Sequence, residues 1–181
     1  MGLPFHFPPS ERSIWRPLDD EDRVSWLNAA RDRFFDKAAP FVPPKIPGRT
    51  VALDGTLVDN LLGFYCALGE AVNGPGGYFG LSMQAFDDCL FGGFGLEYPY
   101  TIVWHESARS SRALGAAALL TYLDAECDDE LDPIDFAEGI AWREATRAAG
   151  LAGTRTLFEE IVERVRSVPT RNGGSVTLLL D

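Results

Sequence analysis

Three short apolar segments lie far apart in the sequence, at residues 49–53 (RTVAL), 100–104 (YTIVW) and 175–180 (SVTLLL). Each has the length and the apolar character of a buried strand. The chain between them carries apolar residues at helical spacing, so helices must connect one strand to the next. Strands joined in this way run parallel and are covered by helices. The sequence therefore predicts an α/β fold, with a small three-stranded parallel sheet flanked by helices.

Helix signals account for the chain between these strands. Asp59 and Ser82 can each cap an amphipathic segment, because their side chains accept hydrogen bonds from the free amides of a first helical turn. The helix after Ser82 is expected to be short and to end near Gly92 and Gly93. Further helices are predicted over residues 20–38, 110–125, 133–149 and 156–168.

Residues 1–48 form an extension before the first strand. The extension consists of a proline-containing arm up to residue 13, the helix over 20–38, and a stiff linker with prolines at both ends, at Pro40 and Pro47. Proline cannot continue a helix, so the linker separates the helix of the extension from the first strand. The main domain is predicted over residues 49–181, with a helical insertion at about residues 123–157.

The charge balance restricts the class of partner. The formal net charge is −11 and the isoelectric point is about 4.6. Contacts to phosphate require Lys and Arg, so this balance argues against direct binding of nucleic acid. It favours a basic partner protein, although a solvated acidic surface explains the same charge.

Nothing in the sequence predicts a membrane protein. No unbroken apolar stretch is long enough to span a bilayer. The first ten residues lack the basic start, the apolar core and the cleavage site of a signal peptide. We therefore expect a cytoplasmic protein without a membrane partner.

The cysteines predict no disulfide framework. Cys66, Cys89 and Cys127 are odd in number and widely spaced, and His6 and His105 do not cluster with them. Disulfide-rich domains and zinc sites need paired or closely spaced ligands. The expected state is three buried, reduced thiols, with no metal and no other cofactor.

One segment is similar to a catalytic motif but lacks its essential residue. Residues 51–60 (VALDGTLVDN) resemble the first motif of the haloacid dehalogenase-like phosphatases, D-x-D-G-T-L-V. In that family the first aspartate is the nucleophile, and here its position is held by Ala52. Without a nucleophile Asp54 cannot support phosphoryl transfer, so the segment is interpreted as a strand, a glycine turn and a helix cap.

A second resemblance extends over more of the chain. Residues 78–90 (YFGLSMQAFDDCL) place two aromatic residues and a glycine before a capped helix that contains Asp88-Cys89-Leu90. This order resembles the barstar family of intracellular ribonuclease inhibitors. The flanking segments, at residues 49–77, 98–120 and 158–181, are similar to the remaining strands and helices of that family.

The resemblance implies an inhibitor of the antitoxin or immunity type rather than an enzyme, with no catalytic residue. Such a protein blocks the basic active site of a ribonuclease or related toxin, because carboxylates on a helix occupy the places of substrate phosphates. Asp88 matches the family's central carboxylate, and Tyr78 and Gly80 match loop positions that pack on the enzyme. The implied partner-binding residues are Tyr78, Phe79, Gly80, Ser82, Gln84, Asp87, Asp88, Gly92 and Glu163.

Three positions depart from the family pattern. Ser82 replaces a polar amide, Gln84 replaces a first helical carboxylate, and Asp87 replaces an aromatic residue. Gln84 and Asp87 lie three residues apart, on neighbouring parts of one helix face. The acidic surface is therefore expected to be reshaped, which favours a target enzyme other than barnase, the ribonuclease that barstar inhibits.

Two other functions remain open at this point. The same fold could be an interaction module with a non-nuclease partner, bound through the extension (Trp26, Phe34, Phe35) or through the insertion. An enzyme would need His105-Glu106 or the aspartate pair to act in acid–base catalysis. As an inhibitor or as an interaction module, the free protein is expected to be monomeric.

Overall fold

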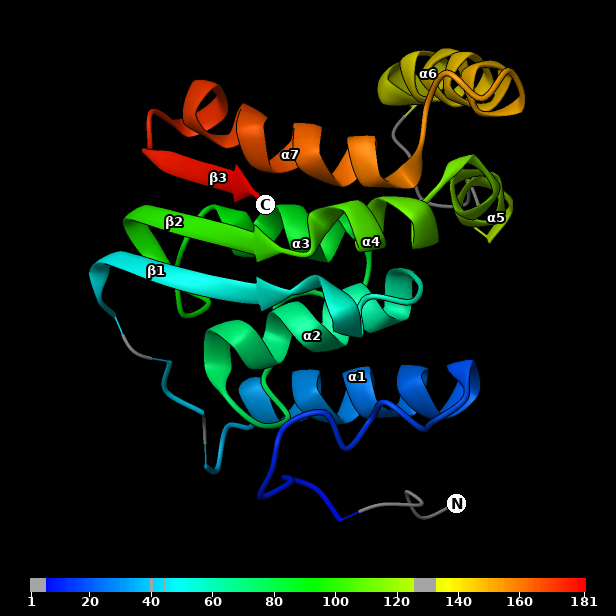
Figure 1. Ribbon diagram of the computed structural model, residues 1–181. Coiled ribbons are helices and arrows are strands. Elements are labelled where there is room, and N and C mark those ends of the chain that lie inside the picture. The colour runs from blue at the N-terminus through cyan, green and yellow to red at the C-terminus, as the bar shows by residue number, and fades with distance from the viewer. Residues whose placement is uncertain (1–5, 40, 44, 126–132) are drawn as a thin grey trace.

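The computed structural model describes residues 6–39, 41–43, 45–125 and 133–181. Strands β1 (Pro47–Asp54), β2 (Glu97–His105) and β3 (Val176–Leu180) form one parallel sheet in the order β1-β2-β3. Figure 1 shows the three strands side by side, with helices along them. The predicted α/β fold with a three-stranded parallel sheet flanked by helices is confirmed.

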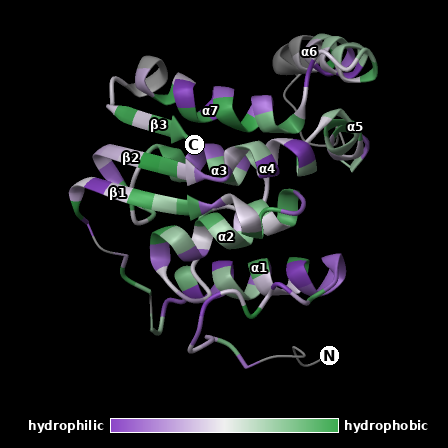
Figure 2. Ribbon diagram, viewed as in Figure 1, coloured by the Kyte–Doolittle hydropathy of each residue, from purple (hydrophilic) through white to green (hydrophobic). Residues whose placement is uncertain are grey.

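The helices pack against one face of the sheet. Leu53 and Ile102 point inward and are buried, whereas Ala52, one position along β1, is exposed. The outward face of the edge strand β3 is also solvent-accessible at Leu179. Burial therefore alternates along β1 and β2, and Figure 2 shows the apolar colouring of the three strands.

Three helices close the core over the inner face of the sheet. They are α2 (Leu61–Asn73), α3 (Met83–Leu90) and α7 (Leu157–Asn172). A small cavity between these helices and the sheet is lined by apolar side chains from all three helices and all three strands. Ser82 caps α3 as predicted, with its hydroxyl accepting from the amide of Ala85 at 3.2 Å.

Two helix predictions are corrected. Asn60, not Asp59, caps α2 and accepts a hydrogen bond from the amide of Gly63 at 2.8 Å. The segment predicted as one helix over 110–125 forms two, α4 (Ser107–Ala113) and α5 (Ala116–Ala125). Helix α4 is followed by a short break before α5, and Leu114 in this break is fully buried.

Helix α6 (Pro133–Leu151) packs against α5 at one end of the molecule (Figure 1). These helices contain most of the segment predicted as an insertion. Cys127 lies outside the described residues, as do most side chains of the acidic run that begins at Asp124. Cys66 and Cys89 are free and buried, and burial raises the pKa of both thiols, so these two match the predicted state. No helix of the described residues is long and apolar enough to cross a membrane.

The extension contributes to the same hydrophobic core as the rest of the chain. Its helix α1 (Asp20–Phe34) ends four residues earlier than predicted and lies along α2, on the side away from the sheet (Figure 1). Trp15 and Trp26 are fully buried in that core. The described residues of the extension therefore share one hydrophobic core with the predicted main domain.

An ion pair between a buried arginine and an exposed aspartate joins α1 to the start of α2. Arg23 is almost fully buried and donates two hydrogen bonds to the carboxylate of Asp59, at 2.7 and 2.8 Å. Burial alone would raise the pKa of the Asp59 carboxyl, but the hydrogen bond and the charge of Arg23 outweigh it and lower this pKa. The pair therefore adds stability above the unfolded-state pKa of Asp59, about 3.9.

Replacing Asp59 by asparagine should make the free energy of unfolding less dependent on pH under acidic conditions. The folded-state pKa is the lower one, so the contribution of Asp59 is lost as pH falls below about 4. Urea unfolding at pH 7 and near pH 3 measures this directly. The loss of stability in Asp59→Asn should be clear at pH 7 and smaller near pH 3. An equal loss at both values would mean that charge plays no part.

A matched control for that experiment is Asp32→Asn. Asp32 forms an ion pair with Arg31 at 3.0 Å, but both side chains are exposed to solvent. Exposed ion pairs contribute little to stability. We therefore expect a small effect of Asp32→Asn at either pH.

Candidate functional site

Helix α3 presents one polar face while its other face anchors it in the core. Met83, Phe86 and Cys89 are buried beneath the helix. Gln84 and Asp88 are exposed, one turn apart, on the opposite face. A short helix fixed in this way holds the two polar side chains in a defined direction toward solvent.

The two adjacent aspartates of α3 have different surroundings. Asp87 is half-buried, and its carboxylate accepts a hydrogen bond from Arg164 of α7 at 2.6 Å. Its charge is therefore compensated within the chain. The spacing of Gln84 and Asp87 suggested that both lie on one exposed face, but only Gln84 is exposed. Asp88 is exposed, and within the part of the chain that the structure describes no ion pair involves it.

The residues that precede α3 build its first turn. Phe79 is fully buried, with its ring 6.4 Å from that of Phe86. Gly80 has φ +91°, and a Cβ atom there would lie 2.8 Å from the backbone N and Cα of Phe86. Only glycine fits this close approach in this conformation. Phe79 and Gly80, together with the cap Ser82, thus have structural roles in this chain.

Tyr78 lies under the extension. It is 5% exposed, and its ring lies 5.7 Å from Phe34, 6.0 Å from Phe35 and 6.3 Å from Phe94. Burial raises the pKa of its hydroxyl to about 12, with a further contribution from the charge of Asp88. The family resemblance could not predict that Phe34 and Phe35 cover Tyr78, because both residues belong to the extension, which the resemblance does not include.

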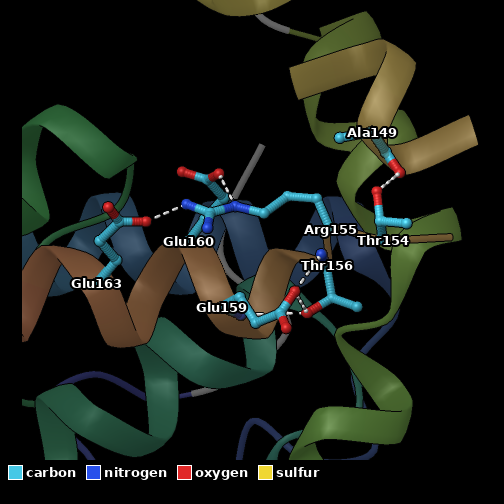
Figure 3. Close-up of polar contacts among 7 residues, drawn as sticks. All are labelled: Ala149, Thr154, Arg155, Thr156, Glu159, Glu160 and Glu163. Carbon is cyan, nitrogen blue, oxygen red and sulfur yellow. Dashed lines mark hydrogen bonds and ion pairs between the residues drawn. The ribbon is translucent and has the colours of Figure 1, made fainter. Parts of the chain in front are cut away.

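Glu163 is exposed on α7, and its charge is compensated. Arg155 lies between Glu160 and Glu163 and forms ion pairs with both, the first at 2.6 Å (Figure 3). Its hydrogen bonds to Glu160 and Glu163 raise the pKa of the guanidinium. Thr156 and Glu159 form a capping box that begins α7 just after Arg155. Asp88 is thus the carboxylate of the predicted set without such compensation among the described residues.

The end of α3 adds an exposed aromatic residue that was not among the predicted site residues. Phe91 is 40% exposed and lies three residues after Asp88 and seven after Gln84, so the three share one helical face. This spacing in the sequence could have indicated Phe91 as a further site residue. Gly92 comes next with φ +101° and allows the chain to turn away from the helix.

The candidate acid–base residues lie elsewhere. His105 is at the end of β2, where its Nδ1 lies 2.8 Å from a carboxylate oxygen of Asp181. Both side chains are about half-exposed. The apolar cavity lies under the sheet and contains neither residue in its lining. Among the described residues, no cluster of three or more His, Cys, Asp or Glu side chains could hold a metal ion.

Comparison with known proteins finds one family whose model matches part of the chain. Residues 48–137 match the model of a family described as Barstar (barnase inhibitor). The matched residues run from β1 through α5 into the start of α6, and they end before α7 and β3. No curated protein and no solved structure matches the chain.

Proposed function

The chain is barstar-like over residues 48–137, and we propose that it is an intracellular inhibitor that blocks the basic active site of a ribonuclease or related toxin. The observation that carries this proposal is the position of Asp88. It is an exposed carboxylate in the middle of α3, whose buried face is fixed in the core.

The physical basis is the mimicry of phosphate by carboxylate. A ribonuclease holds its substrate phosphates in a cleft lined by cationic side chains, and charge-assisted hydrogen bonds to a carboxylate satisfy the same donors. A net charge of −11 also speeds the approach of a basic partner at low ionic strength. Asp88 would supply the specific contact, and the remaining acidic residues the long-range attraction.

The proposal is tested with a panel of secreted bacterial ribonucleases and any toxin encoded beside the gene. The unchanged chain should inhibit at least one of them stoichiometrically and compete with an oligonucleotide for its active site. Calorimetry at two salt concentrations should show weaker binding at higher salt, because screening reduces the charge attraction. A folded chain that inhibits none of these enzymes would overturn the proposal.

A second candidate is a barstar-fold interaction module with a non-nuclease partner. The favouring observation is that Asp87 and Glu163 are paired with Arg164 and Arg155, so the site carries less uncompensated charge than the resemblance implies. This candidate predicts a partner that binds without any ribonuclease activity to inhibit. Binding that does not compete with an oligonucleotide would favour it.

A further inference from the structure

The extension is fixed to the glycine-rich loop at residues 74–80 (GPGGYFG), which leads into α3. Glu70 of α2 is buried, and its two carboxylate oxygens accept hydrogen bonds from the amide of Ser13 at 2.8 Å and the amide of Gly76 at 3.2 Å. Arg33 of α1 donates to the carbonyl of Pro75 at 3.2 Å. One buried carboxylate thus joins the extension and the loop, and the end of α1 is held beside that loop.

The end of α1 places aromatic rings over the loop. Phe34 stacks on Phe94, with ring centroids 5.3 Å apart, and lies against Tyr78. Phe35 lies 6.0 Å from the Tyr78 ring and 6.2 Å from the Phe94 ring. Tyr78 is buried here, whereas Phe35 is 56% exposed. Phe35 therefore lies against the buried Tyr78 ring and is itself exposed at the surface.

The two rings that Phe35 contacts flank α3 along the chain. Tyr78 comes five residues before the first residue of α3 and Phe94 four residues after its last, so Phe35 lies beside both segments that bound this helix. Phe91 lies on the same face of α3 as Asp88 and is also exposed. An exposed carboxylate is thus accompanied by two exposed aromatic residues, one from each helix.

We propose that Phe35 of the extension forms one partner-binding surface with Asp88 and Phe91 of α3, and that its occupant is a basic ribonuclease-type protein. The inference rests on the function proposed above and adds the extension to its site. A carboxylate with aromatic residues around it fits a cationic cleft with an apolar rim, because the aromatic contacts exclude water from the charge contact.

The anchoring of α1 makes this surface preformed. Trp15 and Trp26 are fully buried, so the helix that carries Phe35 is held by the core and not by the partner. A contact residue on a fixed helix loses little conformational freedom when a partner binds. The extension therefore contributes to specificity for the target enzyme and does not act as a segment that detaches from the site.

The test compares Phe35→Ala and Phe91→Ala with a matched control, Val24→Ala. Val24 is 46% exposed on the same helix, about three turns before Phe35. Dissociation constants are measured by calorimetry against a ribonuclease that the unchanged chain inhibits. We expect each phenylalanine variant to bind about fivefold to thirtyfold more weakly, and Val24→Ala to bind as the unchanged chain does.

A second variant, Phe35→Lys, guards against an effect on folding, which circular dichroism checks in each variant. An exposed lysine is compatible with the helix but repels a basic partner, so binding should weaken further than in Phe35→Ala. If Phe35→Ala and Phe35→Lys bind normally while Asp88→Ala binds weakly, the extension lies outside the surface and the proposed function stands. If the unchanged chain inhibits no ribonuclease, both proposals fall.

Discussion

Replacing Trp26 by alanine is expected to lower the free energy of unfolding by about 3–5 kcal/mol. The side chain is fully buried between α1 and the rest of the core, and the Phe7 ring meets it edge-on with centroids 5.3 Å apart. Truncation would remove a large apolar surface and leave a cavity that the anchored helix cannot close. The loss is large because the extension shares the core of the chain.

Urea unfolding monitored by circular dichroism measures this loss. Val24→Ala on the same helix is the control, and its effect should stay within about 0.5 kcal/mol because Val24 faces solvent. A loss below about 1 kcal/mol in Trp26→Ala, or a separate early transition for α1, would show that the extension is a detachable unit. For the same reason, the extension is better probed by point substitutions than by deletion.

Replacing Asp88 by alanine should weaken binding to the inhibited ribonuclease by at least about 2 kcal/mol, roughly thirtyfold. The carboxylate would be enclosed by cationic donors of the enzyme in the complex, and its removal leaves those donors unpaired in a desolvated site. Phe91 and Gln84 beside it would exclude water from that contact. The loss should therefore appear mainly as faster dissociation.

The control for Asp88→Ala is Glu144→Ala, which changes the net charge by the same amount. Glu144 is exposed on α6, far along the chain from α3. Its removal should alter only the long-range attraction, and that small effect should vanish at high salt. Equal effects of both substitutions at every salt concentration would show that overall charge, and not Asp88, determines binding.

Several features of the fold depend on local sequence alone. The three apolar segments predicted the strands, and their helical connections predicted the parallel arrangement, because a parallel pair requires a long crossover. The cap at Ser82 predicted the start of α3, since capping depends on residues within one helical turn. The exposure of Asp88 opposite Cys89 and Phe86 agrees with ordinary helical periodicity.

The wrong prediction of the residue that caps α2 also has a physical cause. Asp59 and Asn60 are both good capping residues, so local preference could not choose between them. Arg23 of the extension binds the Asp59 carboxylate, and Asn60 is the residue that caps α2. Arg23 also donates a hydrogen bond to the side chain of Asn60 at 3.2 Å, so both candidate residues contact a segment that is distant in the sequence.

The sequence by itself determined the strands, the helix that carries the site and the acidic character of the surface, because these depend on neighbours along the chain. Only the tertiary structure decided which site residues are accessible. Asp87 and Asp88 are adjacent, but Arg164, 77 residues away from Asp87, compensates one and not the other. Tyr78 is likewise covered by Phe34 and Phe35 of the extension. Packing brings such residues together, and local periodicity contains no information about it.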